Sequence, residues 1–253
     1  MQLESICTIV TGGASGLGRA VVESFAKKGA HAAIFDTDEE AGRTVAKAAG
    51  GAFFKVDVAN ASQMAKSMAA AQSALGPPRI LVNCAGVGAS AKTVDRNGAP
   101  HPLDMFSRIL AVNVTGTFNA ITQFAALAAQ NEPIGEERGV IINTASIAAY
   151  DGQMGQAAYA ASKGGVISMT LPVARDLARY GVRVCTIAPG LFLTPMLNGA
   201  PETVRTSLAQ SVPFPQRLGD PGEYALLAEQ IVANPMLNGE TIRLDAALRM
   251  APK

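Results

Sequence analysis

The chain is predicted to be an α/β protein with a doubly wound, parallel, seven-stranded sheet and helices on both faces. Short β-branched apolar runs alternate with longer helical stretches, which is typical of right-handed strand–helix–strand crossovers. The runs are apolar throughout, as strands covered on both faces require. Because no linker rich in Pro, Gly or Ser divides the 253 residues, we expect a single domain over 1–253.

Each element can be placed in order from its pattern. The predicted strands end at Val10, Phe35, Val56, Asn83, Ser146, Ala188 and Leu244. The predicted helices span 16–28, 38–49, 62–75, 103–130, 156–180 and 221–232. For the last helix, Asp220 is the expected N-cap and Pro221 the first helical residue. The stretch 189–220 shows no regular pattern and is expected to be an irregular substrate-binding loop, with 87–102 bordering the same site.

Composition and charge narrow the class of protein. Hydrophobic residues make up 49% and charged residues 16%, which is too apolar for a disordered chain. With 21 Lys and Arg against 20 Asp and Glu, no basic surface for nucleic acid is expected. No apolar run is long enough for a membrane span, and the N-terminus shows no signal peptide. We therefore expect a soluble intracellular protein.

Metal chemistry is not expected from the residues available. The chain has only two histidines and three widely spaced cysteines, Cys7, Cys84 and Cys185. Each cysteine lies in an apolar run, so we interpret all three as buried, reduced thiols rather than metal ligands or disulfide partners.

A glycine-rich loop follows the first predicted strand. “TGGASGLG” carries Gly12, Gly16 and Gly18, with Ser15 and Leu17 between them, and opens the first helix. Glycine permits a tight turn and lets the backbone approach a pyrophosphate, whose charge a helix N-terminus favours. A loop of this kind can be only a turn, but its place between strand and helix predicts dinucleotide binding.

The second strand ends in an acid that bears on cofactor choice. Asp36 lies eighteen residues beyond Gly18, where a carboxylate can accept hydrogen bonds from an adenosine ribose. It would repel the 2′-phosphate of NADP, and neither Ser15 nor Thr37 offers a counter-charge, so NAD is predicted. The alternative is that Asp36 only caps the next helix.

Further residues at strand ends are expected to complete the cofactor site. Asp57 and Val58 follow the third strand, where they would meet the adenine. The fourth strand ends in “NCAG”, which brings Asn83, Ala85 and Gly86 beside the ribose. All these positions lie at the carboxyl edge of one sheet, where open α/β sheets bind ligands.

The stretch “AAYAASKGG” places Tyr159 and Lys163 four residues apart in a predicted helix. Such side chains lie one turn apart on the same face, so the ammonium can reach the phenol. A nearby ammonium favours the phenolate, so we expect Lys163 to lower the pKa of Tyr159 and make it a general acid or base. Ser146, thirteen residues earlier, can donate to a developing oxyanion. Taken alone, Tyr-x-x-x-Lys is usually a solvated helix face.

Together these motifs resemble the short-chain dehydrogenase/reductase family over essentially the whole chain. The resemblance rests on “TGGASGLG”, Asp57, “NCAG”, Asn113 in “AVNVTG”, Ser146, the Tyr159–Lys163 pair and “APG”. It implies a Rossmann-type fold and NAD(P)-linked oxidoreduction of an alcohol or ketone. A closer resemblance, in stretches such as “PFPQRLGDP” and “LNGETIRLDAALRM”, is to members that oxidise 3-hydroxyacyl-CoA and hydroxysteroids. One departure is that the common Asp-Gly-Gly is Asp245, Ala246 and Ala247 here.

The resemblance also implies roles for individual residues. Asn113 would hold a water that passes protons through Lys163, and Lys163 would bridge the nicotinamide ribose hydroxyls. Thr194 would hold the carboxamide and direct transfer to the pro-S face, beside Pro189, Gly190 and Phe192. Gln153 is a candidate substrate contact, with Ser146 and Tyr159. A homotetramer is implied as well.

Three functions stay open at this stage. The first is NAD-dependent dehydrogenation of short-chain (S)-3-hydroxyacyl-CoA, and the second is oxidation of a hydroxysteroid or another secondary alcohol. The third is a structural NAD-binding subunit, against which the intact catalytic set argues. The apolar residues of the long loop suit an acyl chain or a sterol; they are Leu191, Phe192, Leu193, Met196 and Leu197. Four basic residues, Lys92, Arg96, Arg205 and Arg217, would either meet CoA phosphates or be solvated loop charges.

Overall fold

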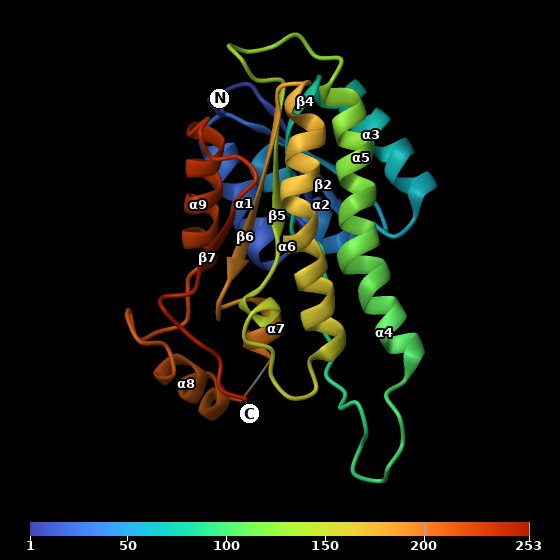
Figure 1. The fold of residues 1–253 in the computed structure, drawn as a ribbon. Coiled ribbons are helices and arrows are strands. Elements are labelled where there is room, and N and C mark those ends of the chain that lie inside the picture. Colours follow the sequence, from blue (N-terminus) through green and yellow to red (C-terminus); the bar gives the residue numbers. More distant parts are fainter. Residues whose placement is uncertain (200, 253) are drawn as a thin grey trace.

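The computed structural model describes residues 1–199 and 201–252, with the side chains of Met196 and Asn198 outside the description. Seven parallel strands form one sheet in the order β3-β2-β1-β4-β5-β6-β7, which confirms the predicted fold class (Figure 1). The strands are β1 (Cys7–Thr11), β2 (His31–Asp36), β3 (Ala52–Lys55), β4 (Pro78–Asn83), β5 (Gly139–Thr144), β6 (Val182–Pro189) and β7 (Thr241–Leu244).

The strand order reverses between β1 and β4. β1 pairs with β2 on one side and with β4 on the other, so the connections from these neighbouring strands leave in opposite directions. Such a reversal opens a crevice at the carboxyl ends of the strands, where α/β sheets bind ligands.

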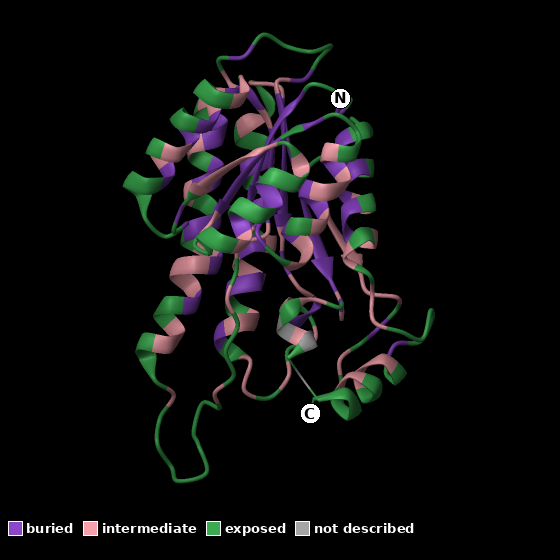
Figure 2. Cartoon of the chain, turned by 180° about the vertical axis from the view of Figure 1, so that it is seen from behind, coloured by how far each residue is buried: buried purple, intermediate pink, exposed green. Residues whose placement is uncertain are grey.

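Two helical layers cover the sheet. α1 (Gly16–Lys27), α2 (Glu39–Ala49) and α9 (Pro221–Ala233) pack on one face, around a core that includes Val22, Phe25 and Ile231. α3 (Ala61–Leu75), α5 (Thr117–Ala128) and α6 (Ala157–Ala178) cover the other, around Met64 and Phe124. Figure 2 shows the buried strands between helices whose outer faces are exposed. Because helices cover both faces of the sheet, the strands are mostly apolar along their whole length.

The helix predicted over 103–130 is interrupted. α4 (Leu103–Leu110) passes into a π-helical segment, Ala111–Gly116, before α5 begins. Periodicity did not reveal the interruption, because the segments before and after the π-helical turn are both α-helical and form one continuous helical run. π-helical turns are frequent at functional sites, and this one contains Asn113.

The prediction that 189–220 is irregular is wrong. The segment contains α7 (Pro195–Asn198) and α8 (Glu202–Gln210). Pro195 starts α7 and Glu202 occupies the first turn of α8, both favourable start signals that short helices leave hard to see. At the end of the segment, Asp220 caps α9 with Pro221 as its first residue, as predicted.

The loops at the carboxyl edge differ in reach. The loop before α4 projects beyond the body of the molecule, at the same end as α7 and α8 but on the side of α4 (Figure 1). Elsewhere the helices are of ordinary size, and none in the described ranges combines the length and apolar character that crossing a membrane requires.

Candidate active site

A cavity of about 990 Å³ opens at the carboxyl edge of the sheet, lined by the ends of the first six strands. It brings together residues that the sequence predicted to bind cofactor or substrate. These are Gly12, Ser15, Gly16, Leu17, Gly18, Asp36, Asp57, Val58, Ala85, Gly86, Ser146, Gln153, Tyr159, Lys163, Pro189, Gly190, Phe192 and Thr194. Asn83 and Asn113 are the predicted site residues that lie outside this lining.

The glycine-rich loop has no room for side chains at two positions. Gly12 has φ +67°, and a Cβ there would lie 2.6 Å from the backbone nitrogen of Ala85. A Cβ on Gly18 would lie 2.2 Å from the carbonyl oxygen of Gly12. These contacts keep β1, the loop and α1 close together, so the backbone itself forms the cavity wall that a pyrophosphate would approach.

Asp36 is tied to the glycine-rich loop. One carboxylate oxygen accepts a hydrogen bond from the backbone nitrogen of Ala14 at 3.0 Å. The other accepts from the backbone of Asp38 at 3.1 Å. The N-cap of α2 is Asp38, whose side chain accepts from Ala41, so the alternative that Asp36 is the cap is wrong. Asp36 therefore places a negative charge at the cavity wall.

The end of the cavity below β3 has one polar and one apolar side chain. The Asp57 carboxylate accepts from the backbone nitrogen of Ala59 at 3.0 Å. Val58 is buried against Gly116 of the π-helical segment, where a Cβ would lie 2.6 Å from the valine. The pair can contact a flat ring by its edge and its face.

Tyr159 and Lys163 lie on the first turns of α6, and Ser146 follows β5. The Lys163 ammonium is 5.8 Å from the centre of the Tyr159 ring. The expectation that Lys163 lowers the pKa of Tyr159 is not met. Burial raises the pKa of the Tyr159 phenol, and the neighbouring Ser146 hydroxyl offsets only part of that rise. The phenol of the chain by itself is therefore protonated at neutral pH.

Lys163 is directed to the backbone rather than to the phenol. Its Nζ donates to the carbonyl oxygen of Thr144, the last residue of β5, at 2.9 Å. Burial lowers the pKa of this ammonium to about 8. A buried cation with donors to spare next to a cavity is well suited to meet a polar ligand.

Asn113 and Asn83 form hydrogen bonds behind the cavity lining. The Asn113 side chain accepts from the backbone nitrogen of Val87 at 2.8 Å and donates to the carbonyl oxygen of Val87 and the hydroxyl of Ser162, both at 2.9 Å. Asn83 donates to Asn143 at 2.9 Å, within the sheet. The expectation that Asn83 lies beside a ribose is therefore not met by its side chain, because strand pairing turns it into the interior.

The opposite wall comes from the segment after β6. Gly190 contacts Asp245 so closely that a Cβ would lie 2.9 Å from its Cα. Thr194 lies against Gly16: a Cβ added to Gly16 would lie 3.6 Å from the Cβ of Thr194. Gln153 donates to the carbonyl oxygen of Ala251 at 2.9 Å, so it ties the C-terminal segment to the cavity rim.

The cavity lining also contains residues that the sequence did not predict. Arg108 enters from α4, Leu208 from α8 and Met250 from the C-terminal segment. No local spacing indicates them, because each comes from an element that only tertiary packing brings near. Among the basic loop residues considered for CoA phosphates, Arg217 forms an ion pair with Glu223 at 2.6 Å.

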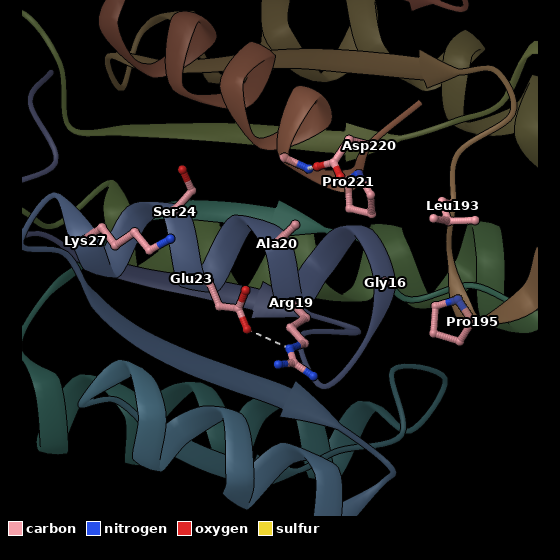
Figure 3. Close-up of a pocket in the computed structure, with 11 residues that line it drawn as sticks. Gly16, Arg19, Ala20, Glu23, Ser24, Lys27, Leu193, Pro195, Asp220 and Pro221 are labelled. Atoms are coloured by element: carbon pink, nitrogen blue, oxygen red, sulfur yellow. Dashed lines mark hydrogen bonds and ion pairs between the residues drawn. The ribbon is translucent and has the colours of Figure 1, made fainter. Parts of the chain in front are cut away.

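A second, smaller hollow of about 450 Å³ adjoins the first, between α1 and the start of α9 (Figure 3). Its one ion pair among the residues drawn joins Arg19 to Glu23 at 2.7 Å. It shares Gly16 and Pro195 with the large cavity but contains none of Ser146, Tyr159 and Lys163. The predicted catalytic residues Ser146, Tyr159 and Lys163 therefore belong to the large cavity.

Comparison with known proteins agrees with this geometry. Residues 7–205 match the family described as short chain dehydrogenase. The chain belongs to the short-chain dehydrogenase family. Dehydrogenases of this family are oxidoreductases that generally use NAD(H).

The similarity to individual relatives extends over almost the full length of this chain. The chain is 51% identical to 3-hydroxyacyl-CoA dehydrogenase type-2 from Drosophila melanogaster, over 99% of this chain and 100% of the relative. It is 50% identical to the Homo sapiens protein of that name, over 99% and 98%. The crystal structure of 3-hydroxyacyl-CoA dehydrogenase type-2 from Mycobacterium avium superposes with a TM-score of 0.95 at 39% identity, covering 98% of both chains.

A more distant relative is named for one stereoisomer of the substrate. The chain is 35% identical to a (3R)-3-hydroxyacyl-CoA dehydrogenase from Homo sapiens, over 88% of this chain and 87% of the relative. Only this second name states the stereochemistry of the substrate, so both hydroxy epimers belong in any test.

Proposed function

We propose that this chain interconverts short-chain (S)-3-hydroxyacyl-CoA and 3-oxoacyl-CoA with NAD as cofactor. The observation that carries the proposal is the single cavity in which Ser146, Tyr159 and Lys163 face the glycine-rich loop and Asp36. The full-length likeness to 3-hydroxyacyl-CoA dehydrogenases type-2 supports the substrate class.

In reduction, the Ser146 hydroxyl donates to the oxo oxygen of the substrate and orients it. The Tyr159 phenol, which burial keeps protonated, then delivers its proton to that oxygen. When bound, NADH supplies the hydride. The ammonium of Lys163 stabilises the phenolate that remains on Tyr159, and Asn113 holds the loop at Val87 in place beside them.

The cofactor proposal follows from the donors at the glycine-rich loop. The absence of side chains at Gly12 and Gly18 fits a backbone that approaches a pyrophosphate. Asp36 would accept from the adenosine ribose and repel a 2′-phosphate, which favours NAD over NADP. Asp57 and Val58 would contact the adenine, Ala85 and Gly86 the ribose, and Thr194 with Pro189, Gly190 and Phe192 the nicotinamide end.

The region 189–220 is proposed to hold the substrate, with Gln153 at its rim. Leu191, Leu197 and Leu208 bring apolar walls to the cavity. The same walls favour a second candidate, a hydroxysteroid or other secondary alcohol, because a sterol and an acyl chain both need apolar contact. A purely structural NAD-binding subunit is the third candidate.

The deciding experiment is the initial rate of acetoacetyl-CoA reduction with NADH, beside NADPH and a panel of keto-steroids. We expect fast NADH-dependent turnover of the CoA ester and slower turnover of steroids. In the reverse direction, (S)-3-hydroxybutyryl-CoA should be oxidised and the (R) epimer should not. Steroid turnover without ester turnover would favour the second candidate.

Tyr159→Phe separates an enzyme from a structural subunit. We expect turnover to fall about 10³-fold, the usual range for removing a general acid, while folding and NADH binding persist. Near-normal turnover in this variant would refute the assignment of the acid.

A homotetramer is proposed from the resemblance. Its support here is that the outer faces of α5 and α6 expose apolar side chains, with Phe118 48% and Leu171 44% exposed. Light scattering on the purified protein would give the assembly mass directly.

A further inference from the structure

A cluster of three polar side chains adjoins Lys163, of which Tyr224 is fully buried and the other two are partly buried at the cavity wall. It consists of Cys84 after β4, Thr144 at the end of β5 and Tyr224 on α9. The hydroxyl oxygens of Thr144 and Tyr224 are 2.7 Å apart. Thr144 also donates to the Cys84 sulfur at 3.5 Å, and that sulfur lies 3.9 Å from the Tyr224 hydroxyl. The three groups thus form hydrogen bonds with one another between the cavity wall and the buried core around α9.

Thr144 connects this cluster to the proposed catalytic groups. Its carbonyl oxygen is the only hydrogen-bond acceptor of the Lys163 ammonium within the described ranges. Its side chain faces α9, whereas its carbonyl faces α6, so one residue joins both helical layers. Ser146 follows two residues later. Any movement of Thr144 therefore moves the acceptor of Lys163 and the start of the Ser146 segment together.

Tyr224 is firmly anchored at the other end of this link. It is fully buried, and its helix begins with a capping box in which Asp220 and Glu223 each accept a backbone hydrogen bond. Burial raises the pKa of this phenol far above its usual range, so it stays neutral. A buried tyrosine hydroxyl needs a partner, and here the partner is the strand end next to Lys163.

We propose that Tyr224 is a positioning residue, which holds the end of β5 through the Thr144 hydroxyl so that the Thr144 carbonyl receives Lys163. This inference rests on the proposed function only in taking Lys163 as part of the catalytic set. Tyr224 itself does not line the cavity, and its hydroxyl is linked to the Lys163 ammonium through Thr144.

The test is direct titration of Lys163 by NMR on protein labelled with ¹³C-lysine, without cofactor. The spectrum of Lys163→Met identifies the signal. In the wild-type protein the pKa is expected to be about 8. In Tyr224→Phe, a looser carbonyl stabilises the ammonium less, so we expect this pKa to fall by at least roughly half a unit. The kcat for acetoacetyl-CoA reduction should fall about 5- to 30-fold, with the KM for NADH within about twofold.

Variants of Thr144 sharpen the test. Thr144→Val removes the same link, so it should reproduce the shift and add little to Tyr224→Phe in the double variant. Thr144→Ser keeps the hydroxyl and should restore the wild-type titration. Thr144→Val also tests the link if Tyr224→Phe fails to fold.

A matched control is available on α6. Thr170 and Thr186 form another buried hydroxyl pair, 2.6 Å apart, that does not touch Lys163. Thr170→Val should lower Tm and leave the Lys163 titration unchanged. An unchanged titration in Tyr224→Phe overturns the proposal, whether or not Tm or kcat has fallen. Failure of the wild-type protein to reduce acetoacetyl-CoA would instead refute the substrate, because the titration needs no turnover.

Discussion

Two buried cations lie at opposite edges of the sheet and differ in their partners. Arg183, near the amino end of β6, is 6% exposed and forms an ion pair with Glu137. Its guanidinium also donates to the backbone carbonyls of Ile231, Val232 and Leu237. Lys163, at the carboxyl edge, is 5% exposed and donates to the carbonyl of Thr144.

This difference in partners indicates a structural role for Arg183 and a ligand-binding role for Lys163. A buried charge with a counter-ion and several acceptors holds neighbouring elements together. A buried ammonium with one acceptor has N–H donors left for a ligand. Because burial disfavours the charged form, the pKa of the ammonium is lowered. Replacement of Lys163 should therefore lower turnover without loss of stability, whereas replacement of Arg183 should lower stability without loss of turnover.

Lys163→Met should give the largest effect. We expect turnover to fall about 10³-fold, because the phenolate on Tyr159 loses its cation. Stability should rise by about 2 kcal/mol at pH 7, since burial of the charge costs more than the lost hydrogen bond contributes.

The pH dependence of that stability has a definite sign. The folded pKa of about 8 lies below the ordinary value of 10.5, so the unfolded chain binds more protons between these two values. The wild-type protein therefore gains stability relative to Lys163→Met as pH rises through this window. Urea unfolding of both proteins from pH 7 to 10 measures it. A stability difference that stays constant over this range would contradict a buried charge at Lys163.

Arg183→Met should do the reverse. Removal of the guanidinium leaves the buried Glu137 with only the N-terminal ammonium of Met1 as an ion-pair partner, so we expect a loss of about 3 kcal/mol in the free energy of unfolding. Turnover per folded molecule should remain normal, because Arg183 lies at the edge away from the cavity. Denaturant unfolding together with kcat checks both parts, and a stable but inactive variant would break the comparison.

Asp36→Ala should have an intermediate effect. Without the carboxylate, NADPH is no longer repelled, so the preference for NADH should fall about 10- to 100-fold, as for removal of one charged contact. The ratio of kcat/KM for the two cofactors measures it. A wild-type protein that prefers NADPH would refute the role given to Asp36.

The smallest effect is expected at Ala246 and Ala247, which stand where the family commonly has two glycines. Ala246 and Ala247 have φ +52° and +63°, in the left-handed region that favours glycine. Replacement of both by Gly should relieve strain of about 1–2 kcal/mol per residue, partly offset by backbone entropy, for a net gain of about 1 kcal/mol. A rise in Tm with unchanged kcat is the expected result, and a lower Tm would show that the strain is absent.

Local patterns account for the predicted residues that the structure brings together in one cavity. The glycine-rich loop, Asp36 and the Tyr159–Lys163 pair each depend on residues that are close in sequence and on the rule that parallel strands end at one edge. Asp220 and Pro221 marked the start of α9 for the same reason. The Asn83 side chain failed this logic because its strand register turns it toward Asn143.

By itself, the sequence determined the alternation of strands and helices, the glycine-rich turn and the spacing of Tyr159 and Lys163, because these follow from local sterics and helix periodicity. Only the tertiary structure decided the π-helical turn at Asn113 and the direction of the Tyr159 pKa shift. It also decided the contact between Tyr224 and Thr144, which joins residues 80 positions apart. Burial and long-range hydrogen bonds depend on how layers pack, and no local pattern encodes them.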